Sequence, residues 1–273
     1  MIVGTMTTSR WRQPAHRIAA LARAEGVLLR RNRLALLNAL VLPVLLVVAL
    51  KAAPSAGDAG GSRGAGAILL TGLVAFALLS AVYYNLVTAL VARREQLVLK
   101  RLRTGQSTDP EILAGTAAPD IAIAWAQIAV AAVAAVAVFG MAPPVNAVLA
   151  LVALVLGTAV FALLAAVSTA ATRTAEMAQV TTLPVLVIPF VLSGPLIPVA
   201  MLPGPLRGLA QALPLTPVAE LMRLALTGTA AGGHHLGLAA TFSAAVIPVL
   251  VLTAWIAAAG WAARRWFRWE PRR

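Results

Sequence analysis

The chain has 273 residues, of which 60% are hydrophobic and 11% are charged. A typical soluble domain is about 45–50% apolar and about 25% charged, so this composition excludes a soluble globular protein and indicates an integral membrane protein. The formal net charge of +13 raises the question of a nucleic-acid partner, and the absence of cysteine excludes disulfide and thiolate chemistry.

Residues 1–33 form a basic arm that contains seven arginines. No small-residue cleavage site follows the next apolar run, so we expect the chain from residue 34 onward to be retained as a membrane span. The stretch RIAALARAEGVLLRR predicts a helix lying on the membrane surface, with a frayed basic tail as the alternative. Its apolar side consists of Ile18, Leu21, Ala22, Leu28 and Leu29.

Six apolar segments are near or above the ~20 residues that a helix needs to cross a bilayer. Residues 121–172 carry no charge and are too many for one crossing, so we expect a turn at MAPPVN, residues 141–146. Backbone groups in lipid must be paired within their own segment, so the spans are expected to be helices. The expected spans are residues 34–50, 67–92, 121–140, 145–172, 180–197 and 242–263.

These segments predict an all-α integral membrane fold with six transmembrane helices. A single six-span domain is expected over residues 34–263, between the basic arm and a basic tail at residues 264–273. A flexible loop rich in glycine and alanine is expected at residues 52–66, between the first two spans.

The positive charge is distributed unevenly between the two sides of the predicted membrane topology. With the N-terminus inside, the inner segments hold 18 of the 22 Lys and Arg residues and the outer segments hold 4. Inner loops carry such an excess in membrane proteins, so both termini are expected to be cytoplasmic. Topology accounts for the net charge, which argues against a nucleic-acid partner. We expect a multi-pass protein of a bacterial inner membrane.

The densest group of charges follows the second span, in RREQLVLKRLRTGQSTDPEILAG, residues 93–115. We expect the helix of the second span to protrude into the cytoplasm and to stop near residues 104–105. Leu97, Val98 and Leu102 would continue its apolar stripe.

A second, short helix is predicted at the end of this charged segment. Pro110 is favoured at the first position of a helix, and Thr108 and Glu111 have the spacing of a capping box. Gly115 predicts the end, so the helix would cover residues 110–114 and expose Ile112 and Leu113. A short rigid helix is suited to be gripped by a partner protein. A solvated loop that serves only topology is the alternative.

Several motifs are missing, and their absence narrows the function. The sequence contains neither a phosphate-binding loop of the G-x-x-x-x-G-K-[ST] type nor an H-E-x-x-H zinc motif. No span has a charged residue near its centre, whereas a carrier driven by an ion gradient usually places one there. Driving energy is therefore expected to enter from outside the spans. A membrane-embedded enzyme would need a polar catalytic set, which we do not find, and a non-transporting membrane assembly protein remains an alternative.

Some polar residues near the spans have two interpretations. Tyr83, Tyr84, Asn85 and Gln127 are candidates for lining a pathway, and packing in the core or at an interface is the alternative for Tyr83 and Tyr84. The pairs Arg173/Glu176 and Glu220/Arg223 have i, i+3 spacing, which favours ion pairs on a helix over contact with a substrate.

The charged segment resembles a motif of the membrane subunits, or permeases, of type-2 ATP-binding-cassette exporters, which include drug-resistance and polysaccharide exporters. The resemblance starts with a basic arm and two spans and continues with R-E-x-x-x-x-K-R-L-R-x-x-x-x-x-P-x-x-I-L-x-G. The matching residues are Arg94, Glu95, Lys100, Arg101, Leu102, Arg103, Pro110, Ile112, Leu113 and Gly115.

A second stretch, LSGPLIPVAMLPGPLRGLAQALPLTPVAELMRLALTG, resembles the segment before the last span in the same family. The resemblance implies short re-entrant helices on the outer side over residues 196–217, and the many prolines independently exclude one continuous helix there. The matching residues are Ser193, Gly194, Pro198, Leu202, Pro203, Leu213, Pro214, Leu215, Thr216, Arg223 and Gly228.

The resemblance further implies how such a protein would work. Residues 110–114 would be the coupling helix, seated on a separate cytoplasmic ATPase that binds ATP and Mg²⁺, while this chain binds no cofactor. Two permeases, identical or paralogous, would line a pathway that exports a hydrophobic or amphiphilic molecule through the lipid bilayer. The residues implied in coupling are Arg94, Glu95, Lys100, Arg101, Arg103, Asp109, Pro110, Glu111, Ile112 and Leu113.

Overall fold

The structure is a computed structural model that describes residues 61–104, 108–194, 199, 202–230 and 234–269. The expected surface helix of the basic arm and the expected first span lie outside these residues. In the described part, the chain is helical apart from loops and an isolated antiparallel bridge between Thr229 and His235. The all-α fold predicted from the sequence is thus confirmed.

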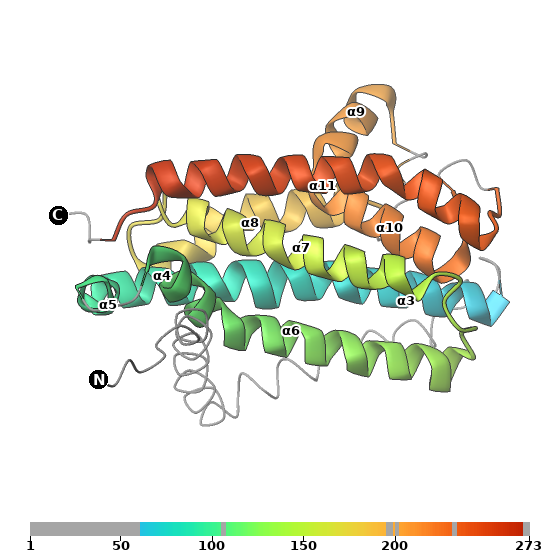
Figure 1. Cartoon of the computed structure of the whole chain (residues 1–273), viewed down its shortest axis with the longest axis horizontal. Coiled ribbons are helices and arrows are strands. Elements are labelled where there is room, and N and C mark those ends of the chain that lie inside the picture. Colours follow the sequence, from blue (N-terminus) through green and yellow to red (C-terminus); the bar gives the residue numbers. More distant parts are fainter. Residues whose placement is uncertain (1–60, 105–107, 195–198, 200–201, 231–233, 270–273) are drawn as a thin grey trace, which may run out of the picture.

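Five helical segments among the described residues are long and apolar enough to cross a membrane, and they correspond to the expected second to sixth spans. They run side by side along the long axis of the molecule (Figure 1). The segments are Gly64–Glu95, Asp109–Phe139, Ala147–Ser168, Ala175–Leu192 and Leu238–Trp266.

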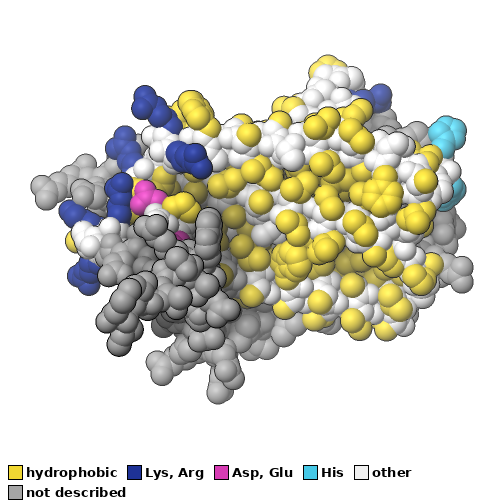
Figure 2. Space-filling view, viewed as in Figure 1, with side chains coloured by type: hydrophobic (Ala, Val, Ile, Leu, Met, Phe, Trp, Pro, Cys, Tyr) yellow, Lys and Arg dark blue, Asp and Glu magenta, His cyan; other side chains and the backbone are white. Residues whose placement is uncertain are grey.

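Hydrophobic and charged side chains are distributed unevenly over the surface of this bundle along the same axis. Figure 2 shows a wide hydrophobic band, with most of the visible Lys and Arg side chains at one end and histidines at the other. One end of the bundle holds the start of the Asp109–Phe139 segment and the C-terminal part of the Leu238–Trp266 segment. We call this end the basic end, and the opposite one the far end.

The second span lies at the centre of the bundle. It consists of α3 (Gly61–Ala77), the π-helical turn η2 (Leu78–Tyr84) and α4 (Asn85–Glu95), which follow one another without a break. In its most apolar window 72% is buried inside the protein, against 17–33% in the other four segments. Burial on all sides explains why this span is apolar around its whole circumference.

Residues 61–66 correct one expectation, because they are the first turns of α3 and not part of a flexible loop. A Cβ atom at Gly66 would lie 3.1 Å from Cβ of Met141 and 3.2 Å from Cβ of Phe139. Glycine therefore permits α3 to approach the end of the third span closely, and this packing extends the helix despite its low intrinsic propensity.

The third span, α6 (Asp109–Phe139), corrects a second expectation. The short helix predicted over residues 110–114 does not stop at Gly115 but is the first part of this 31-residue helix. Gly115, Thr116 and Ala117 are buried against the bundle. This packing outweighs the weak helix propensity of glycine, so the charged hairpin leads directly into a membrane span.

The expected turn at residues 141–146 is confirmed, because it joins α6 to α7 (Ala147–Ser168). Asn146 caps α7 by accepting a hydrogen bond from the Leu149 backbone N–H at 3.2 Å. Its Nδ2 donates to Oγ1 of Thr241 at 3.0 Å, which ties the turn to α11 (Leu238–Trp266). The fifth span, α8 (Ala175–Leu192), begins and ends about five residues before the expected boundaries.

The proline-rich segment forms two short helices, α9 (Gly204–Ala212) and α10 (Leu215–Thr227). At about 1.5 Å per residue, the 13 residues of α10 cover about 20 Å, too short to cross a hydrocarbon core of about 30 Å. Most of α10 is buried, and the carbonyl at Ala225 accepts a hydrogen bond from the Asn146 N–H at 3.0 Å. The broken helix predicted here is confirmed, although it extends beyond residue 217 to Thr227.

Candidate coupling site at the basic end

The helix of the second span does not continue to residue 104 as expected. It ends at Glu95, and Leu97 takes a left-handed backbone conformation with φ 58° before the short helix α5 (Val98–Arg103) begins. Leu97 is 41% exposed, whereas Leu99 is fully buried. The left-handed turn therefore breaks the apolar stripe predicted through Leu97 and turns Leu99 toward the protein instead.

Arg94 is the most deeply placed cation of this segment, with 1% of its surface exposed. Its Nη1 donates to the carbonyl oxygen of Thr169 at 2.8 Å, and its Nη2 donates to those of Thr172 and, at 3.1 Å, Arg173. These carbonyls lie at the C-terminal end of α7 and in the turn before α8. Carbonyls at a helix end have no partner within the helix and carry partial negative charge, so a guanidinium is well suited to bind them.

This placement corrects the role expected for Arg94. A buried guanidinium cannot present itself to another protein, so Arg94 joins two parts of the same chain. It fixes the end of α4 to the turn between α7 and α8. Hydrogen bonds from a charged donor are stronger than neutral ones, which makes this a firm attachment.

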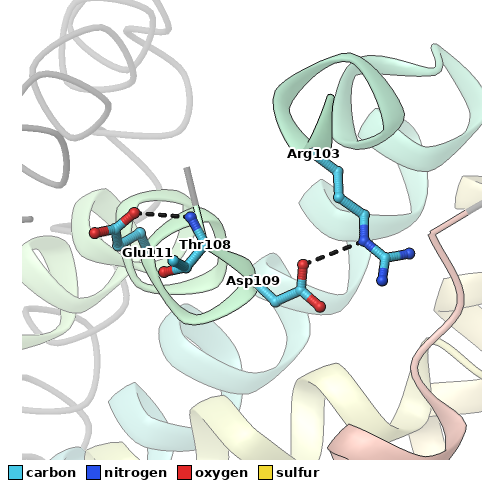
Figure 3. Close-up of polar contacts among 4 residues, drawn as sticks. All are labelled: Arg103, Thr108, Asp109 and Glu111. Carbon is cyan, nitrogen blue, oxygen red and sulfur yellow. Dashed lines mark hydrogen bonds and ion pairs between the residues drawn. The ribbon is translucent and has the colours of Figure 1, made fainter. Parts of the chain in front are cut away.

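The start of α6 is built as the sequence predicts. Thr108 and Glu111 form a capping box, in which the Thr108 backbone N–H donates to Oε2 of Glu111 at 2.8 Å (Figure 3). Ile112, expected to be exposed, is fully buried, and Leu113 is half-buried. The reason is that this turn belongs to a long helix that packs against the central span, so its apolar side chains face the bundle.

An ion pair closes the hairpin between α5 and α6. Nε of Arg103 lies 3.3 Å from Oδ1 of Asp109, and each side chain is about half exposed (Figure 3). The Arg103 guanidinium also lies over the ring of Trp269, 5.1 Å from its centroid. An exposed ion pair contributes little by itself, but here it is joined to a cation–π contact with the C-terminal part of the chain.

The remaining residues implied in coupling lie on the surface. Glu95, Lys100, Arg101 and Pro110 are exposed, together with Thr104 and Thr108. The hairpin thus separates into an inner set, which holds it to the bundle, and an outer set, which a partner could reach. This division was not evident in the sequence, where all of these residues belong to one motif.

The candidate pathway residues differ widely in burial. Tyr83 is fully buried and its hydroxyl is hydrogen-bonded to Oγ of Ser168 at 2.9 Å, which links η2 to the end of α7. Gln127 is buried on α6, Tyr84 is half-buried and Asn85 is exposed. No pattern in the sequence predicted the π-helical turn, which is a local feature often found at functional positions.

The candidate residues of the proline-rich segment lie mostly at the ends of helices. Ser193 is buried at the end of α8, Gly194 follows it with φ +97°, and Pro203 precedes α9. Oγ1 of Thr216 donates to the Ala210 carbonyl, which holds α9 and α10 together at the corner begun by Pro214. Pro198 lies outside the described residues.

The two expected helix ion pairs do not close into direct contacts. Arg173 and Glu176 are both exposed and form no ion pair in the described part of the chain. Glu176 lies in the first turn of α8, where the helix dipole favours negative charge. Glu220 and Arg223 are half-buried on α10 and likewise show no direct ion pair among these residues. One helical turn brings such side chains near each other without fixing their rotamers.

Fold and site together define a multi-pass helical membrane protein with a charged hairpin at one end of its bundle. A family model described as ABC-2 type transporter matches residues 16–227, which is most of the chain. The protein belongs to the ABC-2 type transporter family and is a permease component, that is, the membrane part of an ABC transporter. No curated protein matched the sequence.

Proposed function

We propose that this permease exports a hydrophobic or amphiphilic molecule, such as a drug, an antibiotic, a lipid or a glycan-linked lipid, and is powered by a separate cytoplasmic ATPase. The observation that carries the proposal is the hairpin of α5 and α6, which exposes Lys100, Arg101 and Pro110 at the end of a bundle whose spans have no charge near their centres. The family supports an ATPase partner, and the hairpin offers it a charged, rigid surface.

A partner bound at this surface would act on two spans at once. α5 follows the end of the second span after two residues, and α6 is the third span itself. The capping box and the Arg103–Asp109 ion pair stiffen the connection. Because α6 runs without interruption to Phe139, a displacement of its first turn would move the whole helix.

Arg94 would extend the same displacement to the fourth and fifth spans. Its bonds to the carbonyls of Thr169 and Arg173 attach the end of α4 to the turn between α7 and α8. At the basic end, the second, third, fourth and fifth spans are therefore connected by the hairpin and by the hydrogen bonds of Arg94. This arrangement supports a model in which ATP binding by the partner changes the relative position of the spans.

The excess of Lys and Arg at the basic end supports a cytoplasmic location for it, in a bacterial inner membrane. We further propose that two permeases, identical or paralogous, together form the transport pathway. The fifth span supports this, because only 17% of its most apolar window is buried. Its exposed apolar side chains include Val180, Leu183, Val187 and Ile188.

The proposal is tested by reversing charge on the outer set of the hairpin. Lys100→Glu with Arg101→Glu should lower the amount of ATPase that copurifies with the full chain, and ATP-dependent export, roughly tenfold. Arg207→Glu on α9 makes the same kind of change far from the hairpin and should leave both unchanged. Undiminished ATPase binding and export in the double variant would contradict the proposal.

A further inference from the structure

A groove of about 880 Å³ lies near the basic end, between α4, α6, α7 and α11. Its walls are mostly apolar and include Leu90, Leu113, Leu163 and Ile256. Small residues on α7 and α11, Gly260 among them, leave room between these helices. The volume is within the range of about 300–1,000 Å³ that is typical of sites for small ligands.

Among the described residues, the charged side chains that line the groove are Asp109 and Arg264, at its basic end. Asp109 is paired with Arg103, so its charge is largely compensated. Arg264 is exposed and has no such partner among the lining residues. The mouth of the groove therefore carries net positive charge.

The rim of the groove also has the residues that mark a membrane interface. Trp261 and Trp269 line it, and Trp261 stacks edge-to-face on Trp266 with the ring centroids 5.6 Å apart. Tryptophan is enriched at the level of lipid headgroups, so the charged mouth lies where phosphates of the bilayer would be. The apolar remainder of the groove extends from there along the membrane-spanning parts of α7 and α11.

We propose that this groove binds one phospholipid with an anionic headgroup, its acyl chain between α6, α7 and α11 and its phosphate beside Arg264. The mostly apolar walls hold water poorly, so a hydrocarbon chain is the occupant that they match. A basic pocket between spans at the cytoplasmic side matches the phosphate of an anionic lipid. This site goes beyond the proposed transport function and does not depend on it, because a bound lipid needs no ATPase.

The test compares two lipids with the same acyl chains, phosphatidylglycerol and phosphatidylcholine, added to the detergent-purified full chain. Native mass spectrometry should show one phosphatidylglycerol retained per chain, in preference to phosphatidylcholine. Arg264→Glu should lower its retention roughly tenfold, because an anion replaces the cation beside the phosphate. Arg265→Glu, on the next residue but outside the groove lining, should have a much smaller effect.

A second pair of variants tests the acyl-chain part of the site. A side chain at Gly260 would point into free space, since the nearest neighbour of an added Cβ is Leu163 Cδ1 at 4.0 Å. Gly260→Trp should therefore fill the groove without disturbing the fold and abolish retention of both lipids. Ala258→Trp is the matched control, because Ala258 is exposed on the same helix and does not line the groove.

A photoreactive phosphatidylglycerol with a diazirine in its acyl chain tests the unaltered protein. Labelling should concentrate on the peptides that contain Leu163 and Gly260. Equal retention of the two lipids, equal effects of Arg264→Glu and Arg265→Glu, or labelling spread evenly over all exposed span faces would overturn the proposal. The last result would mean that the groove is covered by another segment of the chain or by a second copy.

Discussion

Arg94 differs from the other cations of the charged segment because its guanidinium is inside the protein. Three backbone carbonyls receive its hydrogen bonds, and all three belong to the end of α7 or to the turn that follows. Removing the side chain would leave these carbonyls buried without the donor. A lysine could supply the charge but not the planar, forked arrangement of donors that reaches several carbonyls at once.

We therefore expect Arg94→Ala to lower the free energy of unfolding by about 3 kcal/mol, the cost typical of breaking a buried charged contact. Arg94→Lys should recover only part of it. The measurement is the thermal unfolding of the detergent-purified chain, followed by tryptophan fluorescence. Glu95→Ala, at the exposed neighbouring position, serves as the control and should change stability little. If Arg94→Ala and Glu95→Ala unfolded at the same temperature, Arg94 would not hold the helices together.

The contact between Tyr83 and Ser168 is a second link between the central span and α7. Tyr83→Phe and Ser168→Ala should each lower stability by about 0.5–1.5 kcal/mol, because a hydrogen bond between spans contributes modestly. The double variant should cost less than the sum of the two single variants. Additive losses in this double-mutant cycle would show that the hydroxyl groups do not interact.

At the scale of helices, the central span is held where η2, α7 and α10 meet. A Cβ atom at Gly157 on α7 would lie 2.9 Å from Cδ1 of Leu78 and 3.1 Å from Cγ2 of Val218. The absence of a side chain thus allows three elements to approach one another. Val218 belongs to the short helix α10, so this contact also fixes the position of that helix in the bundle.

Gly157→Ala should therefore destabilise the protein by about 1–3 kcal/mol, as overpacking of a tight contact does. Gly72→Ala is the matched control, because an added Cβ there meets no atom within 4 Å and alanine favours a helix. The unfolding temperatures of the two variants should shift in opposite directions from that of the unaltered protein, or should differ from each other by several degrees. Equal shifts would contradict the close packing at Gly157.

The spans could be predicted from the sequence because length and apolar composition are local properties. The cap of α6 could be predicted for the same reason, since Thr108 and Glu111 are close in the chain. Gly115 shows the limit: its local preference is for a helix end, but burial against the central span overrides it. The bonds of Arg94 join residues 75 or more positions apart, which no local pattern reveals.

At the scale of the whole molecule, the charges and the helix contacts converge on the same end of the bundle. The exposed cations favour a cytoplasmic location, and the buried Arg94 and the continuous α6 connect that surface to four spans. In the proposed function, such a connection would convert work done by an ATPase into movement within the membrane. We propose that the α5–α6 hairpin is the surface on which that ATPase acts.

The absence of cysteine in the chain allows one direct test of this claim. Lys100→Cys, labelled with a photoactivatable crosslinker in native membranes, should capture an ATPase that contains a phosphate-binding loop, with a yield that changes when ATP is added. Thr253→Cys, exposed on α11 within its membrane-spanning part, should capture none under the same conditions. The claim would be contradicted if position 100 captured no such ATPase, or captured it no better than position 253 did.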